Sequence, residues 1–252
     1  MAKRWTEHEL LIAMNVYCRL PFGKLDQHTP LIVRVAEKMG RTPSSLSMKL
    51  CNFASFDPAL QARGVKGLPG ASRADRAMWD AFHENWNEMS NKSEIAFDQL
   101  MEKDASPSDK QISVPKGDSE TIATLKVRRH QQFFRNTVLA SYEQRCALSL
   151  IAVPSLLNAS HIIPWSESEE RRTDPTNGIC LNALYDRAFD RGLITFDTDL
   201  RLIISRFLKA GEIPEFQRVN FKAIEGTALH LPHRFAPDPK AIEHHREHIF
   251  SH

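Results

Sequence analysis

Paired cysteines are missing from this sequence. Cys18, Cys51, Cys146 and Cys180 are scattered among the 252 residues without any C-x-x-C spacing. A closed zinc site or a disulfide framework usually requires cysteines at short, regular spacings. We therefore expect neither a disulfide scaffold nor a structural zinc ion, and interpret the four thiols as small buried side chains.

Long apolar runs are also missing. The longest, around residues 10–16, is interrupted by polar residues well before the roughly 20 residues that a membrane span requires. Residues 1–9 lack the apolar stretch of a secretory signal. These absences predict a protein without membrane-spanning segments and, by default, a cytoplasmic location.

A large excess of positive or negative charge is missing as well. The 33 Lys and Arg residues are nearly balanced by 31 Asp and Glu residues, and the net charge of +2 is too small to indicate a nucleic-acid-binding protein. Any DNA-binding surface must therefore come from local clusters of cations. The length is sufficient for two modest domains, so we expect one internal boundary.

The first half of the chain has the pattern of a helical domain. Apolar spacing and turn residues predict helices at residues 5–20, 30–39 and 43–53. The third begins with Thr42 before Pro43, a strong helix-start signal. The pattern resembles Myb-like and other three-helix DNA-binding domains, in which Lys49 would face DNA. A helical bundle that contacts proteins is the alternative, because Lys49 is the only cation on the third helix.

A boundary is expected between the two halves of the chain. Residues 57–75 predict an irregular connection, and residues 72–89 a further helix with an apolar packing stripe. The region after residue 103 is rich in Ser, Pro, Asp, Lys and Gly, which is typical of a linker. We predict a helical recognition domain at residues 1–103, a linker at 104–120 and a second domain at 121–252.

A basic helix is predicted directly after the linker. Its cations are Arg128, Arg129 and Arg135, and they alternate with apolar residues at helical spacing. Such a face can contact phosphates, or it can be an ordinary solvated surface. The position of this helix next to the motifs described below favours phosphate contact.

Three short motifs follow in series. They are His-Ile-x-Pro at 161–164, Asn-Gly-x-x-Leu at 177–181 and Asp-x-x-Phe-Asp-x-Gly-Leu-Ile at 186–194. The local pattern predicts a strand that ends before Pro164, a hairpin or tight loop at Asn177-Gly178, and a short helix at about 182–189. Two strands and a helix would then enclose one site.

In this order and spacing, the motifs resemble those of the HNH (ββα-metal) endonuclease family, particularly its bacterial restriction and defence members. The resemblance extends over about residues 127–196. It implies an α+β chain in which a helical N-terminal domain precedes a ββα-metal nuclease domain. It also implies hydrolysis of double-stranded DNA with a divalent metal, for which Mg²⁺ and Mn²⁺ are the best candidates, and a role in restriction or antiphage defence.

The resemblance assigns roles to three residues, and two neighbouring residues bear on the same site. His161 corresponds to the general base and Asn177 to the residue that braces the loop and orients that histidine. Asp186 corresponds to a metal ligand, and Asp190, four residues later, would share its helix face. Ser160 departs from the pattern, because many relatives carry an acidic or histidine ligand there. A hydroxyl is a weak ligand, so the metal site would depend more on Asp190, a backbone carbonyl or water.

Several further expectations accompany this reading. Arg172 and Arg187 are candidates for neutralising phosphates, and a homodimer would allow two single-strand cuts to break both strands. Ser149 stands where some relatives carry the second cysteine of a zinc knuckle, so that zinc site is not expected. The histidines at 244, 245 and 248 match no closed zinc spacing and are interpreted as contacts with solvent or the core.

Two alternatives to the nuclease function stay open. One is a non-catalytic DNA-binding protein built on the ββα scaffold, and the other is an effector whose N-terminal domain senses a protein or a ligand.

Overall fold

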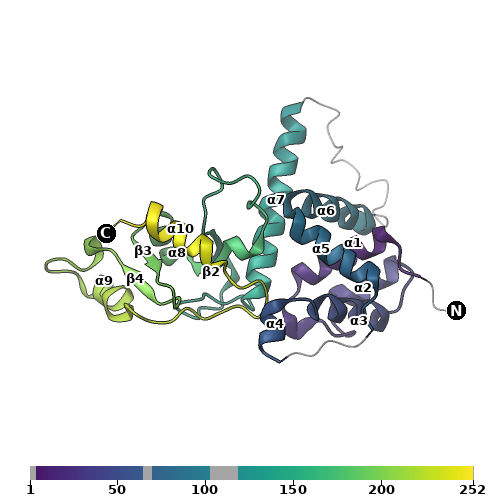
Figure 1. Cartoon of the computed structure of the whole chain (residues 1–252), viewed down its shortest axis with the longest axis horizontal. Helices are drawn as coiled ribbons and strands as arrows, with labels where there is room; N and C mark the ends of the chain where they lie inside the picture. Colours follow the sequence, from purple (N-terminus) through teal and green to yellow (C-terminus); the bar gives the residue numbers. More distant parts are fainter. Residues whose placement is uncertain (1–3, 65–69, 103–118, 252) are drawn as a thin grey trace. The chain divides into compact units, whose positions relative to one another are not determined.

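The computed structural model describes residues 4–64, 70–102 and 119–251 (Figure 1). The chain divides into two compact units, Met1–Thr137 and Val138–His252. The first is helical and the second combines small antiparallel sheets with helices, so the predicted α+β class is confirmed. Among the described residues, no helix is both long enough and apolar enough to cross a membrane.

The N-terminal unit is built from helices of moderate length. They are α1 (Glu7–Arg19), α2 (Pro30–Lys38), α3 (Pro43–Ala54), α4 (Pro58–Ala62), α5 (Arg73–Glu84) and α6 (Trp86–Glu102), with a 3₁₀ turn at Phe22–Lys24 and the first part of α7 (Ser119–Ser141). The three helices predicted first are confirmed to within two residues. Thr6 and Thr42 accept hydrogen bonds from backbone N–H groups in the first turns of α1 and α3. The core gathers around Tyr17, which is fully buried between the rings of Phe53 and Trp79.

The region predicted to be irregular and the helix after it differ in detail. Residues 57–75 contain α4, and residues 65–69 lie outside the described part. The single helix predicted at 72–89 is two helices that meet at Asn85. The side-chain oxygen of Asn85 accepts a hydrogen bond from the Glu88 backbone N–H at 3.0 Å, so this residue caps a new helix instead of continuing the old one.

The predicted linker falls mostly on residues that the structure does not describe. Residues 103–118 are outside the described part, so the boundary at 104–120 stays a prediction. The division between the compact units lies inside α7, after Thr137. Phe133, in the first part of α7, lies 6.4 Å from Phe82 and 6.2 Å from Trp86, measured between ring centroids. These contacts explain why this part of α7 groups with the N-terminal unit.

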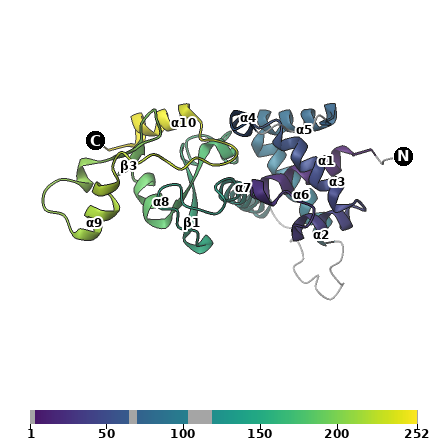
Figure 2. The same ribbon diagram turned by 90° about the horizontal axis from the view of Figure 1, so that it is seen from below.

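The C-terminal unit contains the two strands and the helix that the motifs predict. Strand β1 (Leu157–His161) pairs antiparallel with β2 (Gly178–Asn182), with His161 opposite Gly178, and α8 (Ala183–Asp190) follows β2 directly. Helix α8 packs against β1 (Figure 2). The remaining elements are β3 (Ile194–Phe196), β4 (Leu202–Ile204), α9 (Glu215–Asn220), α10 (Pro239–His244), a π-helical turn (His245–Ile249) and 3₁₀ turns at Pro154–Leu156, Pro175–Asn177, Arg206–Leu208 and Lys222–Ile224.

The connection between β1 and β2 is a long loop. Residues 162–177 form this loop, and Gly178 is already the first residue of β2. The Asn177-Gly178 pair is therefore not the centre of a two-residue hairpin. Asn177 instead ends the 3₁₀ turn before β2, where its side chain bonds back to the beginning of the loop.

Candidate active site

One pocket of the C-terminal unit contains five of the predicted site residues. Its volume is about 380 Å³. Its walls come from the end of β1, the loop after it, α8 and the C-terminal π-helical turn. The polar and charged side chains that line it are Ser160, His161, Asp186, Arg187, Asp190, Arg191 and His245. Residues from the first and the third motif therefore meet at one place.

His161 is the last residue of β1, and its ring is held in one orientation. Its Nε2 lies 3.0 Å from the backbone oxygen of Arg172. A carbonyl oxygen only accepts hydrogen bonds, so Nε2 carries the proton and Nδ1 carries the lone pair of the neutral ring. The ring of Trp165 meets the imidazole edge-on, with the centroids 5.7 Å apart.

The surroundings of His161 favour its neutral form. Burial lowers the pKa of His161 below its ordinary value, although the hydrogen bond to Arg172 and the charge of Asp186 act in the opposite direction. An imidazole with a lowered pKa is unprotonated at neutral pH. His161 can therefore accept a proton through Nδ1 under those conditions.

Asn177 is buried and ties the two ends of the long loop together. Its Nδ2 donates to the backbone oxygens of Ile163, at 3.1 Å, and Arg171, at 3.3 Å. Its Oδ1 accepts from the backbone N–H of Ile163 at 2.9 Å. The residue after Arg171 supplies the carbonyl that orients His161, so the Asn177 amide holds the segment on which this orientation depends.

Asp186 is held by two neutral donors from β1. The Ser160 hydroxyl donates to its Oδ1 at 2.5 Å, and the Asn158 amide donates to its Oδ2 at 2.6 Å. Alternate residues of a strand point to the same face, which explains why residues 158 and 160 both reach α8. Asn158 was not among the predicted site residues, although this alternation from Ser160 was visible in the sequence. The Ser160 hydroxyl is engaged with a carboxylate, so its candidate role as a weak metal ligand stays a prediction.

Asp190 stands four residues after Asp186 on α8 and lines the same pocket. Desolvation and the nearby charge of Asp186 raise the pKa of Asp190, while Arg187 and Arg191 oppose this shift. Among the described residues, no cation forms an ion pair with either carboxylate. The pocket therefore contains two acidic groups whose negative charge no neighbouring side chain neutralises at contact distance.

These donors fit a divalent cation with an open coordination shell. No group of three or more His, Cys, Asp or Glu residues within the described ranges is arranged to enclose a metal ion. Mg²⁺ is commonly bound by one or two carboxylates and completes its shell with water and substrate phosphates. Asp186 and Asp190 provide such a pair, and a cation between them would relieve their mutual repulsion.

The predicted phosphate-contacting cations lie in different environments. Arg187 is exposed at the pocket, whereas Arg172 donates to the Trp165 backbone oxygen at 3.0 Å and lies 3.5 Å from Glu169. Arg128 is exposed on α7, and Arg129 and Arg135 on the same helix are partly buried. These three arginines belong to the N-terminal unit, so their predicted proximity to the catalytic motifs stays a prediction.

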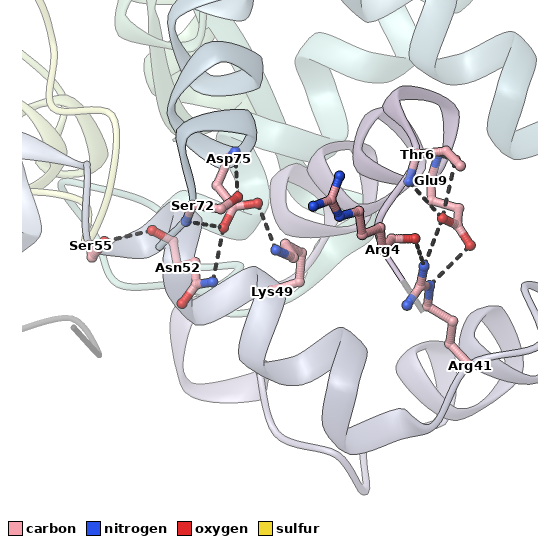
Figure 3. A network of polar contacts seen from close by, with 9 residues as sticks. All are labelled: Arg4, Thr6, Glu9, Arg41, Lys49, Asn52, Ser55, Ser72 and Asp75. Atoms are coloured by element: carbon pink, nitrogen blue, oxygen red, sulfur yellow. Dashed lines mark hydrogen bonds and ion pairs between the residues drawn. The ribbon is translucent and has the colours of Figure 1, made fainter. Parts of the chain in front are cut away.

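The prediction for Lys49 needs correction. Its side chain is buried, and its Nζ lies 2.6 Å from Oδ1 of Asp75 (Figure 3). The Asn52 side chain and the Ser72 backbone N–H donate to the other carboxylate oxygen. Lys49 was the only cation of α3, so this fully described helix presents no exposed cation to a phosphate.

Comparison with known proteins agrees with the geometry. Residues 146–197 match the family model described as HNH endonuclease. None of the curated proteins matches the chain. HNH nucleases act on DNA and generally use a divalent metal. The matched residues contain β1, the long loop, β2, α8 and β3, and this part of the chain is similar to the HNH endonuclease family.

Proposed function

We propose that the C-terminal unit is a metal-dependent endonuclease that hydrolyses DNA phosphodiester bonds. The supporting observation is that one pocket contains an imidazole whose Nε2 is bonded to a carbonyl and two carboxylates without protein counter-ions. A histidine and carboxylates scattered over the surface would not favour hydrolysis. Together in one pocket, they provide a proton acceptor and a binding place for a cation.

His161 is the general base of the proposed reaction. A water molecule loses a proton to Nδ1, its oxygen forms a bond to phosphorus, and the bond from phosphorus to the leaving oxygen breaks. The imidazole becomes positively charged in this step, and the Arg172 carbonyl stabilises it through Nε2. Asn177 acts as a positioning residue, because it holds the loop segment that supplies this carbonyl.

Asp186 and Asp190 are the proposed metal ligands. A bound Mg²⁺ or Mn²⁺ ion would polarise the phosphate and stabilise the charge on the leaving oxygen. Ser160 and Asn158 fix both oxygens of Asp186 on one side, which sets the direction in which the carboxylate faces the pocket. Ser160 thus supports the metal through Asp186, as groups behind metal ligands commonly do.

Double-stranded DNA is the proposed substrate, and restriction or antiphage defence the proposed role. Arg187 and Arg191 at the pocket, with Arg172 on the loop, are the proposed phosphate contacts near the scissile bond. Homodimerisation would place two such pockets on the two strands. Arg128, Arg129 and Arg135 are proposed to contact DNA further from the cut.

Cleavage of a supercoiled plasmid tests this function. The purified chain with Mg²⁺ or Mn²⁺ is expected to nick the plasmid, and His161→Ala to lower the rate by about 10² to 10⁴-fold while duplex binding is retained. Glu170→Gln on the exposed part of the long loop is the matched control and should cleave normally. Equal nicking by wild type and His161→Ala would remove His161 from the mechanism.

A non-catalytic DNA-binding protein is the second candidate. It is favoured by Ser160, which replaces the metal ligand that many relatives carry and is already bonded to Asp186. Duplex binding by the wild type without cleavage in either metal would support it. For the N-terminal unit, the absence of an exposed cation on α3 favours an effector domain that binds a protein or ligand over DNA recognition by this helix.

A further inference from the structure

The residues that follow the family match form part of the same pocket. Residues 238–251, which we name the C-terminal brace, comprise Asp238, α10, the π-helical turn and the two residues after it. His245 and Ile249 of the brace line the pocket together with His161 and Asp190. The match ends at residue 197, so these two residues reach the site from outside the matched segment.

The first part of the brace is attached to the long loop. The Asp238 backbone N–H donates to the Thr176 oxygen at 2.9 Å, and the Asp238 carboxylate accepts from Arg171 at 2.7 Å. Further along, Nε2 of His244 lies 2.9 Å from the Glu167 carboxylate. These contacts reach the long loop at Thr176, Arg171 and Glu167. Arg171 directly precedes Arg172, whose carbonyl orients His161.

The middle of the brace is attached to the end of α8 through His245. This side chain is 1% exposed, and its ring stacks on Phe189 with centroids 3.7 Å apart and planes 2° from parallel. Its Nε2 donates to the Phe189 backbone oxygen at 3.1 Å, and its Nδ1 lies 2.9 Å from the Thr195 hydroxyl. The Phe189 oxygen also accepts from the Gly192 backbone N–H at 2.9 Å, so His245 adds a second, side-chain donor at the end of α8, next to Asp190.

The last residues of the brace pass directly over Gly192. The Ser251 N–H donates to the Gly192 oxygen at 2.8 Å. Gly192 has a φ of +64°, and a Cβ there would lie 2.1 Å from the backbone oxygen of Ile249. Only glycine allows the turn after α8 and the brace to approach this closely.

We propose that the C-terminal brace fixes the two sides of the nuclease pocket relative to one another, and that His245 is the positioning residue for the end of α8. One side is the loop that orients His161 and the other is the helix end that carries Asp190. The consequences for metal binding and cleavage rest on the function proposed above. The mechanical coupling between the long loop and the end of α8 does not rest on that function, because it concerns only the contacts that hold these segments together.

His245→Phe tests the brace in the full chain. Phenylalanine keeps a ring that can stack on Phe189 and removes both hydrogen bonds. Hydrogen exchange measured by mass spectrometry is expected to become about five- to tenfold faster in peptides that cover the end of α8 and the turn at Gly192. The half-saturating concentration of Mn²⁺, titrated by electron paramagnetic resonance, should rise about tenfold.

Three further variants keep the test decisive. His230→Phe changes an exposed histidine outside the brace and should leave both readouts at the wild-type values. His245→Gln retains an amide that can donate to Phe189 and accept from Thr195, so it should recover part of the protection. Asp238→Asn can still cap α10 but weakens the pairing with Arg171, so faster exchange is expected in the long loop even if His245→Phe does not fold.

Unchanged exchange in His245→Phe, or equal acceleration in His230→Phe, would contradict the proposed role of the brace. A wild-type chain that neither cleaves DNA nor binds Mn²⁺, but shows the expected exchange pattern, would support the brace and reject the proposed function. A chain that cleaves DNA with unchanged exchange in His245→Phe and Asp238→Asn would reject the brace and leave the function intact.

Discussion

Two buried acidic side chains of the N-terminal unit and Asp186 of the pocket are satisfied in opposite ways. In the N-terminal unit, Asp75 is paired with Lys49 at 2.6 Å, and Glu9 with Arg41 at 2.8 Å (Figure 3). In the C-terminal unit, Asp186 receives hydrogen bonds only from the neutral donors Ser160 and Asn158 among the described residues. A carboxylate paired with an internal cation has a structural role, whereas one held by neutral donors keeps its charge for a ligand.

The pKa shifts express the same difference. Burial by itself would raise the pKa of Glu9, but hydrogen bonds from Arg41 and Thr6 outweigh it and lower the pKa to about 2. For Asp75, burial is likewise outweighed by Lys49 and Ser72, and the pKa is lowered. In the pocket, desolvation and Asp186 prevail, and the pKa of Asp190 is raised. The pairs with Arg41 and Lys49 therefore stabilise the charges of Glu9 and Asp75, while the pocket leaves the charge of Asp190 uncompensated.

Removing the cation from a buried pair should have the largest effect on stability. Lys49→Met leaves the Asp75 carboxylate buried without a counter-ion, and the free energy of unfolding should fall by about 3 to 5 kcal/mol. Urea unfolding followed by tryptophan fluorescence measures this change. Arg76→Gln is the matched control, because the Arg76–Asp80 pair is exposed at 56% and 47%, and its loss should cost about 0.5 kcal/mol or less. Similar losses in both variants would contradict a special role of the buried pair.

Acid should weaken the N-terminal unit through Glu9. Its folded pKa of about 2 lies below the unfolded value of 4.5, so the unfolded chain binds a proton first as the pH falls. The contribution is present above pH 4.5 and is lost between about pH 4.5 and 2. The shift corresponds to about 3 kcal/mol at most. Urea unfolding between pH 6 and 3 should show a shallower loss in Glu9→Gln than in the wild type, and parallel curves would assign the acid sensitivity to other groups.

The parts of this structure that sequence alone predicted depend on neighbours in the chain. Thr42 before Pro43 predicted the start of α3, and the motifs predicted β1 and α8, because caps and short periodic segments carry their own signals. The burial of Lys49 in an ion pair could not be predicted in the same way, because its partner Asp75 is 26 residues away. His245 was missed for the same reason, because it bonds to Thr195 at a separation of 50 residues. Nothing in the local pattern of either residue indicates such a partner.

Neutralising Asp186 should separate stability from metal binding. Asp186→Asn has nearly the same shape and retains an acceptor for Ser160 or Asn158, so the free energy of unfolding should change by about 1 kcal/mol or less. The negative charge is lost, and Mn²⁺ binding and plasmid cleavage should fall together. Asp199→Asn, on an exposed turn of the same unit, is the control and should alter neither property. A loss of stability as large as that in Lys49→Met would mean that Asp186 is structural like Asp75.

Arg187→Gln should have the smallest effect, on DNA affinity alone. Arg187 is exposed at the pocket, and the described residues include no ion-pair partner for it, so the substitution removes little that supports the fold. Each phosphate contact contributes a nearly constant increment to the salt dependence of binding, and the slope of log K against log salt should become shallower by about 1. Fluorescence anisotropy with a labelled duplex, in the His161→Ala background to prevent cleavage, measures this slope. An unchanged slope would remove Arg187 from the DNA-binding surface, and a marked loss of stability would show that the pocket, like the N-terminal unit, uses its cations to support the fold.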